Sequence, residues 1–313
     1  MISLNKTHES FLKSNKASEI LFAHDIPVGN LETLDSKTIQ VLEKALNEIN
    51  LTREEVLLLT MVEMNHVSIL MSVSNFLRKK YKGELISFSK NIFIPLTQLC
   101  RDQCSYCTFK YEPGEGDLFF SPEKVLEAAK KSTELGCTEM LFVSGDKPEL
   151  MYDVYKKELE KIGYSSTSDY MIGMSELCLE EGIFPHSNLG IAKIDELKRF
   201  KNSNPSMGLM LESISERLME PGEAHYRCPD KYPRARIKTI SDAGKLNIPW
   251  TSGILIGIGE NWEERVDSII ELKRINDEFG HIQEIIIQNF SPKPGIKMEG
   301  SPVPTDLDMI KTV

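Results

Sequence analysis

Short apolar runs alternate with stretches of helical periodicity through most of the chain. Six runs predict buried strands: Asn91–Thr97, Met140–Val143, Ile183–His186, Met207–Leu211, Thr251–Ile256 and Glu284–Asn289. Helical sequence separates them, as at Pro233–Lys245 and Trp262–Phe279, and Pro122 stands at a favoured first helical position behind Ser121. Six strand–helix units in alternation predict an α/β fold with a parallel sheet. This pattern fits both an open doubly wound sheet and a curved barrel.

The first 85 residues lack such strand-like runs. Apolar residues recur at helical spacing over residues 41–49, behind Asp35 or Ser36 as a possible cap. Thr52 and Glu55 have the spacing of a capping box, and an apolar helix is expected to follow to about Lys80 and to end near Gly83. We therefore predict a helical extension over residues 1–85 and an α/β domain over residues 86–313.

The charge of the chain argues against two classes of partner. Net charge is −10, with 47 acidic and 37 basic residues, so there is no general attraction to nucleic acid or to anionic lipid. The segment Met1–Asn15 lacks the apolar core of a signal peptide. The most lipid-like stretch, Val56–Leu77, is interrupted by polar residues such as Glu63 and predicts a buried helix rather than a membrane span. We expect a cytoplasmic protein with no membrane or nucleic-acid partner.

Three of the six cysteines fall within eight residues. Cys100, Cys104 and Cys107 have the spacing C-x3-C-x2-C directly after the first predicted strand. Three thiolates can bind three irons of a [4Fe–4S] cluster and leave the fourth iron open to a ligand. Structural zinc would need a fourth ligand, and no other cysteine or histidine lies nearby in the sequence. A zinc-stabilised binding module and a non-catalytic iron–sulfur protein remain the alternatives from other functional classes.

The remaining cysteines are scattered, and we interpret them as packing residues or free thiols. They are Cys137, Cys178 and Cys228.

The cysteine spacing, with the aromatic Tyr106 before the third cysteine, resembles the signature of the radical S-adenosylmethionine (SAM) superfamily. The resemblance implies a (βα) barrel, a cluster ligated by Cys100, Cys104 and Cys107, and SAM bound to the open iron through its amino and carboxylate groups. It also implies that Tyr106 lies beside the SAM adenine. Because Thr305–Val313 reads as the opening of a helix, we expect the barrel to be incomplete at its C-terminal side.

Three further segments resemble SAM contacts of this superfamily. Ser144, Gly145 and Asp146 follow the second strand and resemble the turn whose backbone binds the SAM amino group. Glu212 and Ser213 resemble the polar contact to the ribose and the amino acid, although Ser213 is also suited to cap a helix.

The third of these segments is Gly253–Glu260, which lacks the last glycine of a dinucleotide-binding fingerprint. It resembles the superfamily's fifth-strand motif, and Gly257 within it is the expected adenine contact.

Polar residues also lie at the ends of the third and sixth strands. His186, Asn188 and Gln288 are pocket candidates, because groups at the carboxyl ends of parallel strands face the active site. A lone histidine is more often a structural residue than a catalyst. The residue that moves protons is not assigned from the sequence.

A narrower resemblance extends over roughly residues 50–300. Asn91–Phe109, Gly208–Ser213, Pro229–Lys231, Gly253–Glu260 and His281–Phe290 resemble the CofG family, the 7,8-didemethyl-8-hydroxy-5-deazariboflavin (FO) synthase subunit. This resemblance implies a lyase of coenzyme F-420 biosynthesis. A 5′-deoxyadenosyl radical would act on an adduct of tyrosine and ribitylaminouracil, and ring closure with loss of ammonia would give FO.

The same resemblance implies two protein partners: the CofH subunit, which makes the adduct, and a reductant such as ferredoxin or flavodoxin. The related radical SAM enzymes of menaquinone biosynthesis and of hydrogenase maturation are the alternatives within the superfamily. The segments quoted for CofG argue against both.

Overall fold

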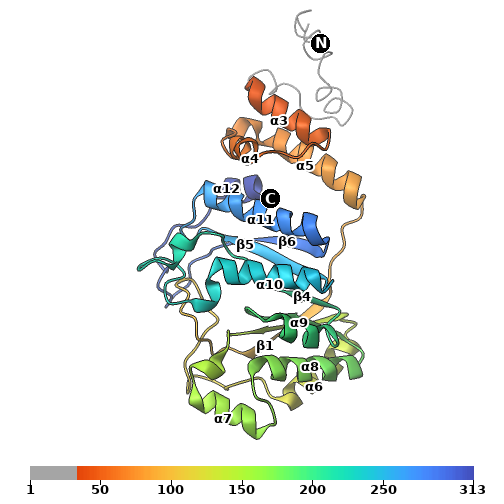
Figure 1. Cartoon of the computed structure of the whole chain (residues 1–313), viewed down its shortest axis with the longest axis vertical. Coiled ribbons are helices and arrows are strands. Elements are labelled where there is room, and N and C mark those ends of the chain that lie inside the picture. Colours follow the sequence, from red (N-terminus) through yellow and green to blue (C-terminus); the bar gives the residue numbers. More distant parts are fainter. Residues whose placement is uncertain (1–33) are drawn as a thin grey trace, which may run out of the picture. The chain divides into compact units, whose positions relative to one another are not determined.

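The computed structural model of the chain describes residues 34–313 (Figure 1). These residues form two compact units. One comprises residues 34–87 together with Pro304–Val313, and the other comprises Phe88–Val303. The segment Met1–Asn15 and the rest of the expected extension up to residue 33 lie outside the described residues.

The first unit is helical in its described part. Its elements are α3 (Ser36–Leu46), α4 (Arg53–Thr60), the 3-10 turn η2 (Met64–His66), α5 (Val67–Lys82) and α12 (Asp306–Thr312). The Asp35 side chain accepts hydrogen bonds from two backbone amides of α3, and Thr52 and Glu55 form the expected capping box of α4. Apolar side chains of α3 and α5, among them Leu42 and Ile69, form the core of this unit.

The apolar helix expected up to Lys80 is broken into two helices, which corrects the prediction. Helix α4 ends at Thr60, and Glu63 has an extended backbone (φ −69°, ψ 158°) that no α-helix can include. Helix α5 then ends, as expected, at Gly83, whose φ of +74° favours glycine. No single helix among the described residues is long and apolar enough to cross a membrane, although the pair Arg53–Thr60 and Met64–Lys82, bent by 107°, meets the length and composition.

The second unit contains one parallel sheet of six strands. The strands are β1 (Asn91–Thr97), β2 (Glu139–Ser144), β3 (Phe184–Asn188), β4 (Ser206–Gly208), β5 (Trp250–Ile256) and β6 (Ile282–Asn289). The helices between them are α6 (Pro122–Glu134), α7 (Asp153–Lys161), α8 (Thr167–Glu180), α9 (Ile194–Lys201), α10 (Pro233–Lys245) and α11 (Trp262–Phe279). The 3-10 turns are η3 (Pro148–Leu150), η4 (Glu216–Met219) and η5 (Pro229–Lys231). The predicted parallel α/β fold with six strand–helix units is confirmed.

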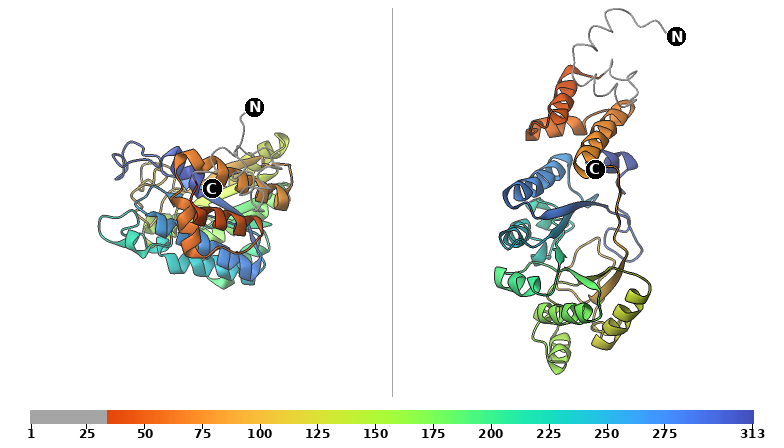
Figure 2. Two further views of the ribbon diagram at one scale, coloured as in Figure 1. Left: turned by 90° about the horizontal axis from the view of Figure 1, so that it is seen from above. Right: turned by 90° about the vertical axis from the view of Figure 1, so that its right-hand side faces the viewer.

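The strand order decides between the two architectures that the sequence allowed. The strands follow one another across the sheet as β1-β2-β3-β4-β5-β6. A doubly wound sheet reverses its order at one point, whereas sequential order places every crossover helix on the same face and curves the sheet. Figure 2 (right) shows the helices following the outer side of the curved sheet. The architecture is therefore barrel-like, with β1 and β6 as edge strands among the described residues.

The fourth strand is shorter than predicted. It ends at Gly208, and the expected strand residues up to Leu211 lie beyond it. The carbonyl of Met210 accepts a hydrogen bond from Arg236 Nε of α10 at 2.7 Å, so it is not available to a neighbouring strand. Pairing with β5 resumes only at an isolated bridge between Glu212 and Ile254.

Two contacts between the sheet and helix α8 show which side chains of the strands face inward. Cys178 of α8 lies 3.2 Å from the sulfur of Met140 in β2, and Ser175 of α8 lies 3.4 Å from Ser187 Oγ in β3. Because side chains alternate along a strand, the residues on either side of Met140 and Ser187 face the inner, concave side.

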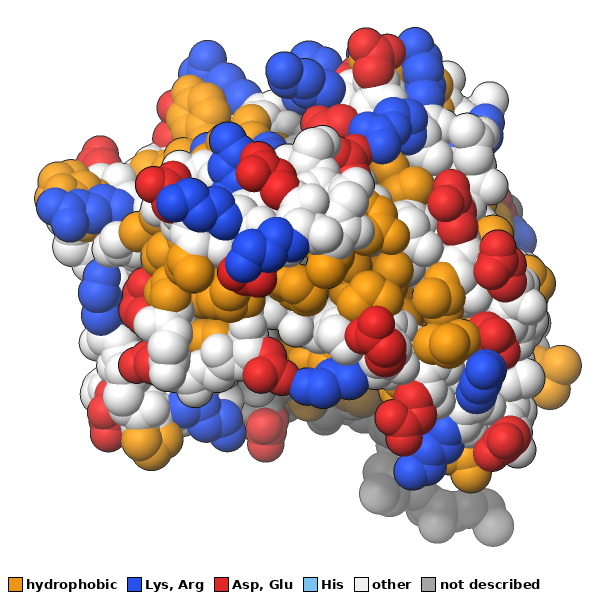
Figure 3. Space-filling view, turned by 90° about the horizontal axis from the view of Figure 1, so that it is seen from below, with side chains coloured by type: hydrophobic (Ala, Val, Ile, Leu, Met, Phe, Trp, Pro, Cys, Tyr) orange, Lys and Arg blue, Asp and Glu red, His pale blue; other side chains and the backbone are white. Residues whose placement is uncertain are grey.

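The outer surface is mixed in character. Figure 3 shows the end of the molecule that carries α7, where acidic and basic side chains surround a band of apolar ones. Large apolar side chains that are exposed at η3 and α7 include Leu150, Met151 and Val154.

Candidate active site at the ends of β1, β2 and β4

Backbone hydrogen bonds connect the cysteine loop after β1 to the loop after β2. Asp146 N donates to Cys100 Sγ at 3.1 Å, and Arg101 N donates to the Asp146 carbonyl at 3.0 Å. Gly145 permits this approach, because a Cβ at that position would lie 1.9 Å from the Leu99 carbonyl oxygen and 2.7 Å from Cys100 Cβ. The predicted glycine turn therefore lies directly against the first cysteine.

The three cysteines of the loop are free thiols in different electrostatic environments. Burial, and then the charge of Asp102, raise the pKa of Cys100 to about 12. A hydrogen bond from the Cys228 thiol and the positive charge of Lys231 lower the pKa of Cys104. Cys104 and Cys107 both line a cavity of about 380 Å³. Three accessible thiols on one loop are a donor set suited to iron, and backbone N–H groups already point at one of the sulfurs.

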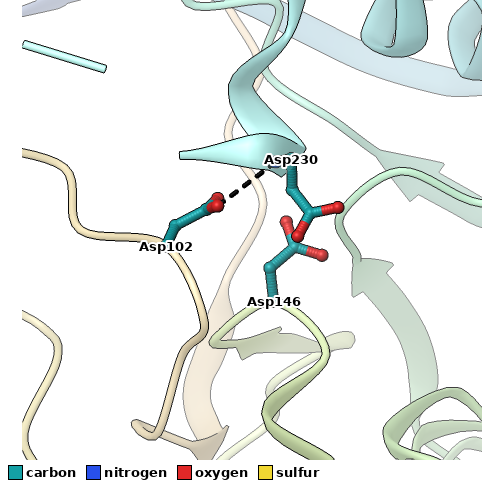
Figure 4. A group of neighbouring side chains, drawn as sticks. All are labelled: Asp102, Asp146 and Asp230. Atoms are coloured by element: carbon teal, nitrogen blue, oxygen red, sulfur yellow. Dashed lines mark hydrogen bonds between the residues drawn. The ribbon is translucent and has the colours of Figure 1, made fainter. Parts of the chain in front are cut away.

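Three carboxylates from three different loops converge beside Cys100 (Figure 4). Oxygen atoms of Asp102, Asp146 and Asp230 lie within 4.8 Å of one another. Asp230, which follows β4 in η5, donates its backbone N–H to Asp102 Oδ1 at 3.2 Å. Burial and the charge of Asp230 raise the pKa of Asp146 to about 7 and also raise that of Asp102.

Cationic side chains already balance much of this acidic group. Arg101 binds Asp230 through Nε and, at 2.5 Å, through Nη2, and Lys147 Nζ lies 3.7 Å from the same carboxylate. The Asp230 side chain is fully buried. Asp102 Oδ2 is also buried and has no hydrogen-bond partner among the described residues. We interpret the group as an ion-pair network that ties three loops together, with one acceptor atom left over.

Glu212, four residues after the end of β4, has a strained backbone conformation. Its φ of +64° is unusual for a residue with a side chain, and such strain is common at functional sites. Glu212 Oε1 accepts a hydrogen bond from Lys231 Nζ at 2.6 Å, and both side chains are largely buried. Burial raises the pKa of Glu212, but the charges of Lys231 and Arg236 outweigh it and hold that pKa below its usual range. The predicted neighbour Ser213 accepts a hydrogen bond from Ser215 N through Oγ at 3.2 Å.

Tyr106 is partly buried and packs against His225, a histidine that was not predicted from the sequence. Tyr106 Oη lies 3.0 Å from His225 Nε2, and the two rings meet edge to face at 5.6 Å between centroids. Burial lowers the pKa of His225 to about 3, so its imidazole is neutral at pH 7. Tyr106 therefore has a fixed position next to the cysteines.

Gly257 lies in a turn that the motif itself stabilises. The Glu260 carboxylate accepts hydrogen bonds from Gly257 N and Ile258 N at 2.9–3.0 Å, and Arg265 binds Glu260 at 2.7 Å. Gly257 and Ser105 line a cavity of about 430 Å³. The turn after β5 thus borders open space beside the cysteine loop.

The remaining predicted residues lie on the strands. Ser144 ends β2 opposite Thr97 and borders a small cavity beside Gly145. His186 and Asn188 share the inner face of β3, while Nε2 of Gln288 in β6 is buried with no hydrogen-bond partner within residues 34–313. The structure brings Cys100, Gly145 and Asp146 into direct contact and places His186 on a separate part of the sheet.

Several residues of the site were not predicted. Asp102, His225, Asp230 and Arg236 are buried and Lys231 is largely buried, and burial cannot be read from a single sequence. Asp230 and Lys231 lie in the segment Pro229–Lys231 that carries the narrower resemblance, but no role was predicted for them; the signal for one is a charged pair following the fourth strand.

Comparison with known proteins places this geometry in context. The model of the radical SAM superfamily matches residues 94–272. The 7,8-didemethyl-8-hydroxy-5-deazariboflavin synthase of Methanopyrus kandleri is 48% identical over 231 residues, which cover 73% of this chain and 69% of that protein. The enzyme of the same name from Methanocaldococcus jannaschii is 41% identical over 272 residues, covering 87% and 71%. The crystal structure of HydG, a maturase of the [FeFe]-hydrogenase, has a similar fold, with a TM-score of 0.72, 18% identity, and coverage of 95% of this chain and 63% of HydG.

Proposed function

Since the chain belongs to the radical SAM superfamily and, within it, to the family of FO synthases, we propose that it converts the adduct of tyrosine and ribitylaminouracil into FO with loss of ammonia. This reaction would make it a lyase of the carbon–nitrogen type. The observation that carries the proposal is the cysteine loop after β1, which is held against the loops after β2 and β4 by the contacts of Cys100 and Asp230.

In this proposal the cofactors bind where the donor set fits them. Cys100, Cys104 and Cys107 would hold a [4Fe–4S] cluster with one iron left open to SAM. When bound and reduced, this pair of cofactors supplies the 5′-deoxyadenosyl radical. The residues proposed to surround SAM are Tyr106, Ser144, Gly145, Asp146, Glu212, Ser213 and Gly257.

The protein's own groups bind and orient the cofactor. The backbone amide of Asp146 donates to Cys100 Sγ, and the unpartnered acceptor Asp102 Oδ2 in the same loop would accept a hydrogen bond from an ammonium group. The Lys231 contact fixes the Glu212 carboxylate, which accepts hydrogen bonds from hydroxyl or ammonium donors. Tyr106, held by His225, closes one side of the site to water.

Two protein partners belong to the same proposal. A CofH-type subunit would supply the adduct, and a ferredoxin or flavodoxin would supply the electron. Both would act at the cofactor side of the sheet.

The test is an anaerobic assay of reconstituted protein with reductant, SAM and the adduct, in which FO fluorescence and 5′-deoxyadenosine are measured together. We expect both products, and we expect Cys104→Ala to abolish both. Cys137→Ala is the matched control, since Cys137 lies outside the loop. Deoxyadenosine without FO would retain the superfamily activity and refute the FO step. If the protein holds a cluster whose spectrum does not change when SAM is added, and if neither product forms, the result would point to a non-catalytic iron–sulfur protein.

A further inference from the structure

The inner face of the sheet divides into an apolar and a polar part. Toward the carboxyl ends of β1 and β2 the inward positions are apolar: Phe93 and Leu141 pair across the two strands, and Val143 follows, whereas the polar inward pair of Asn91 and Glu139 lies at the amino ends. Toward the same ends, the inward positions of β3 and β4 are His186, Asn188, Ser206 and Gly208, while the inward Phe184 lies at the amino end of β3. A ligand in contact with both parts must be apolar at one end and rich in hydrogen-bonding groups at the other.

Two polar atoms converge over one glycine in the polar part. A Cβ at Gly208 would lie 3.1 Å from His186 Nε2 and 3.3 Å from Asn188 Oδ1. Both atoms are therefore close to the same point above the strand. The same Cβ would lie 3.1 Å from the Thr251 carbonyl oxygen, and because Gly208 has no side chain, nothing at this position separates the two polar atoms from the inner side of the sheet.

The histidine is fixed from its other side. His186 Nδ1 lies 2.8 Å from Ser206 Oγ, its register partner on β4. Burial lowers the pKa of His186 to about 4, so the imidazole is neutral near pH 7. When Ser206 donates its hydroxyl proton to Nδ1, the ring proton is on Nε2, and His186 presents a hydrogen-bond donor above Gly208.

The location links this pair to the cofactor side of the sheet. Asn188 is the last residue of β3, and Gly190 follows two positions later. Gly190 lies so close to Asp146 that a Cβ would be 1.8 Å from its Oδ1, and Asp146 N donates to Cys100. The two polar groups therefore lie one short loop away from the cysteine site.

We propose that His186 and Asn188, above Gly208, form the subsite that recognises the uracil ring of the substrate through its imide edge. A carboxamide matches this edge, because its oxygen accepts from the ring N3–H and its NH₂ group donates to a ring carbonyl. His186 Nε2–H donates to the second carbonyl oxygen of the uracil ring. The phenol ring then lies toward Phe93 and Leu141. This inference rests on the proposed function and assigns substrate-positioning residues within it.

The test uses the adduct and an analogue methylated at uracil N3. Dissociation constants are measured by equilibrium dialysis on the cluster-loaded protein with SAM and without reductant, so that no turnover occurs. The wild-type protein is expected to bind the N3-methyl analogue at least about tenfold more weakly than the adduct, since one hydrogen bond is lost and a buried acceptor is left unpaired. Asn188→Ala is expected to bind both compounds equally within about twofold.

Further variants separate recognition from folding. His186→Phe and Gly208→Ala are expected to weaken adduct binding about tenfold. Both should leave the SAM-induced change of the cluster spectrum unchanged. Ser187→Ala is the matched control, because its side chain faces α8. If Asn188→Ala retains the wild-type discrimination, or if His186→Phe binds the adduct normally, the subsite is wrong. A wild-type protein that does not bind the adduct at all would instead refute the proposed function.

Discussion

The buried carboxylate of Asp230 offers the sharpest test of how the three loops are held together. Its side chain is fully buried and is bound by Arg101, while Lys147 lies 3.7 Å away. Asp230→Asn keeps the shape of the side chain, but it removes the charge and replaces one of the two oxygens that accept from Arg101 with an NH₂ donor. We expect this substitution to lower the free energy of unfolding.

The magnitude follows from the exposure of the partner. Removing one member of a buried ion pair costs about 3–5 kcal/mol, because the other charge is left without compensation. The Arg101 side chain is 23% exposed, so water partly compensates it, and we expect about 2–3 kcal/mol. In a unit of this size that loss corresponds to a decrease in Tm of about 5–10 °C.

The assay is thermal and urea unfolding of the cluster-free protein under reducing conditions. Asp195→Asn is the matched control: Asp195 binds Lys198 at 3.0 Å, but its side chain is 85% exposed, and its loss should cost less than about 0.5 kcal/mol. The double variant with Arg101→Gln should be less destabilised than the two single variants added together. Equal unfolding free energies for Asp230→Asn and Asp195→Asn would refute the reasoning.

Three further predictions rest on other contacts of the site. Gly145→Ala should reduce the iron and sulfide bound after reconstitution by more than half, because its Cβ meets the Leu99 carbonyl at 1.9 Å; Gly300→Ala, with open space around it, should bind as much as the wild type. Lys231→Met should raise the pKa of Glu212, because the positive charge that lowers it is removed, and should destabilise the protein at pH 7. Since the wild-type pKa of Glu212 is depressed, its contribution is present above the unfolded value near 4.5 and lost as pH falls through the folded one, which pH-dependent urea unfolding of both proteins would reveal. The pKa of His186 is lowered to about 4, so the folded protein favours the neutral imidazole. The free energy of unfolding should therefore be highest above about pH 6.5 and fall by up to about 3 kcal/mol toward pH 4. In His186→Gln this decrease should be smaller.

Local signals in the sequence were sufficient for the exact bounds of three elements and for the existence of the other strands. Pro233–Lys245 and Trp262–Phe279 are helices between the predicted residues, and Asn91–Thr97 is the predicted strand. In each case the periodicity, a proline or a capping residue acts within the element itself. The prediction of β4 failed at Leu211 because the competing partner, Arg236, is 26 residues away from Met210 and lies on another element.

The candidate site was predictable to the extent that its chemistry lies in one loop. Cys100, Cys104 and Cys107 are recognisable because their spacing alone sets the number of iron ligands. The electrostatics of the site come instead from loops far apart in the sequence, and only the parallel order of the sheet brings their ends together. A charge in a turn after a strand is an ordinary surface feature until topology buries it.

A pattern nevertheless becomes visible once the order of the strands is known. Each of the three loops that meet at the first cysteine carries one acidic and one basic residue side by side: Arg101-Asp102, Asp146-Lys147 and Asp230-Lys231. Adjacent opposite charges cannot neutralise each other well within a tight turn, but they can pair with the charges of a neighbouring loop, as Arg101 does with Asp230. Since burying an unpaired charge is costly, we expect the three pairs to become buried together when the protein folds. The network therefore links the folding of the site to the correct stacking of all three loops, and a chain in which one pair is reversed should lose stability and cluster binding at the same time.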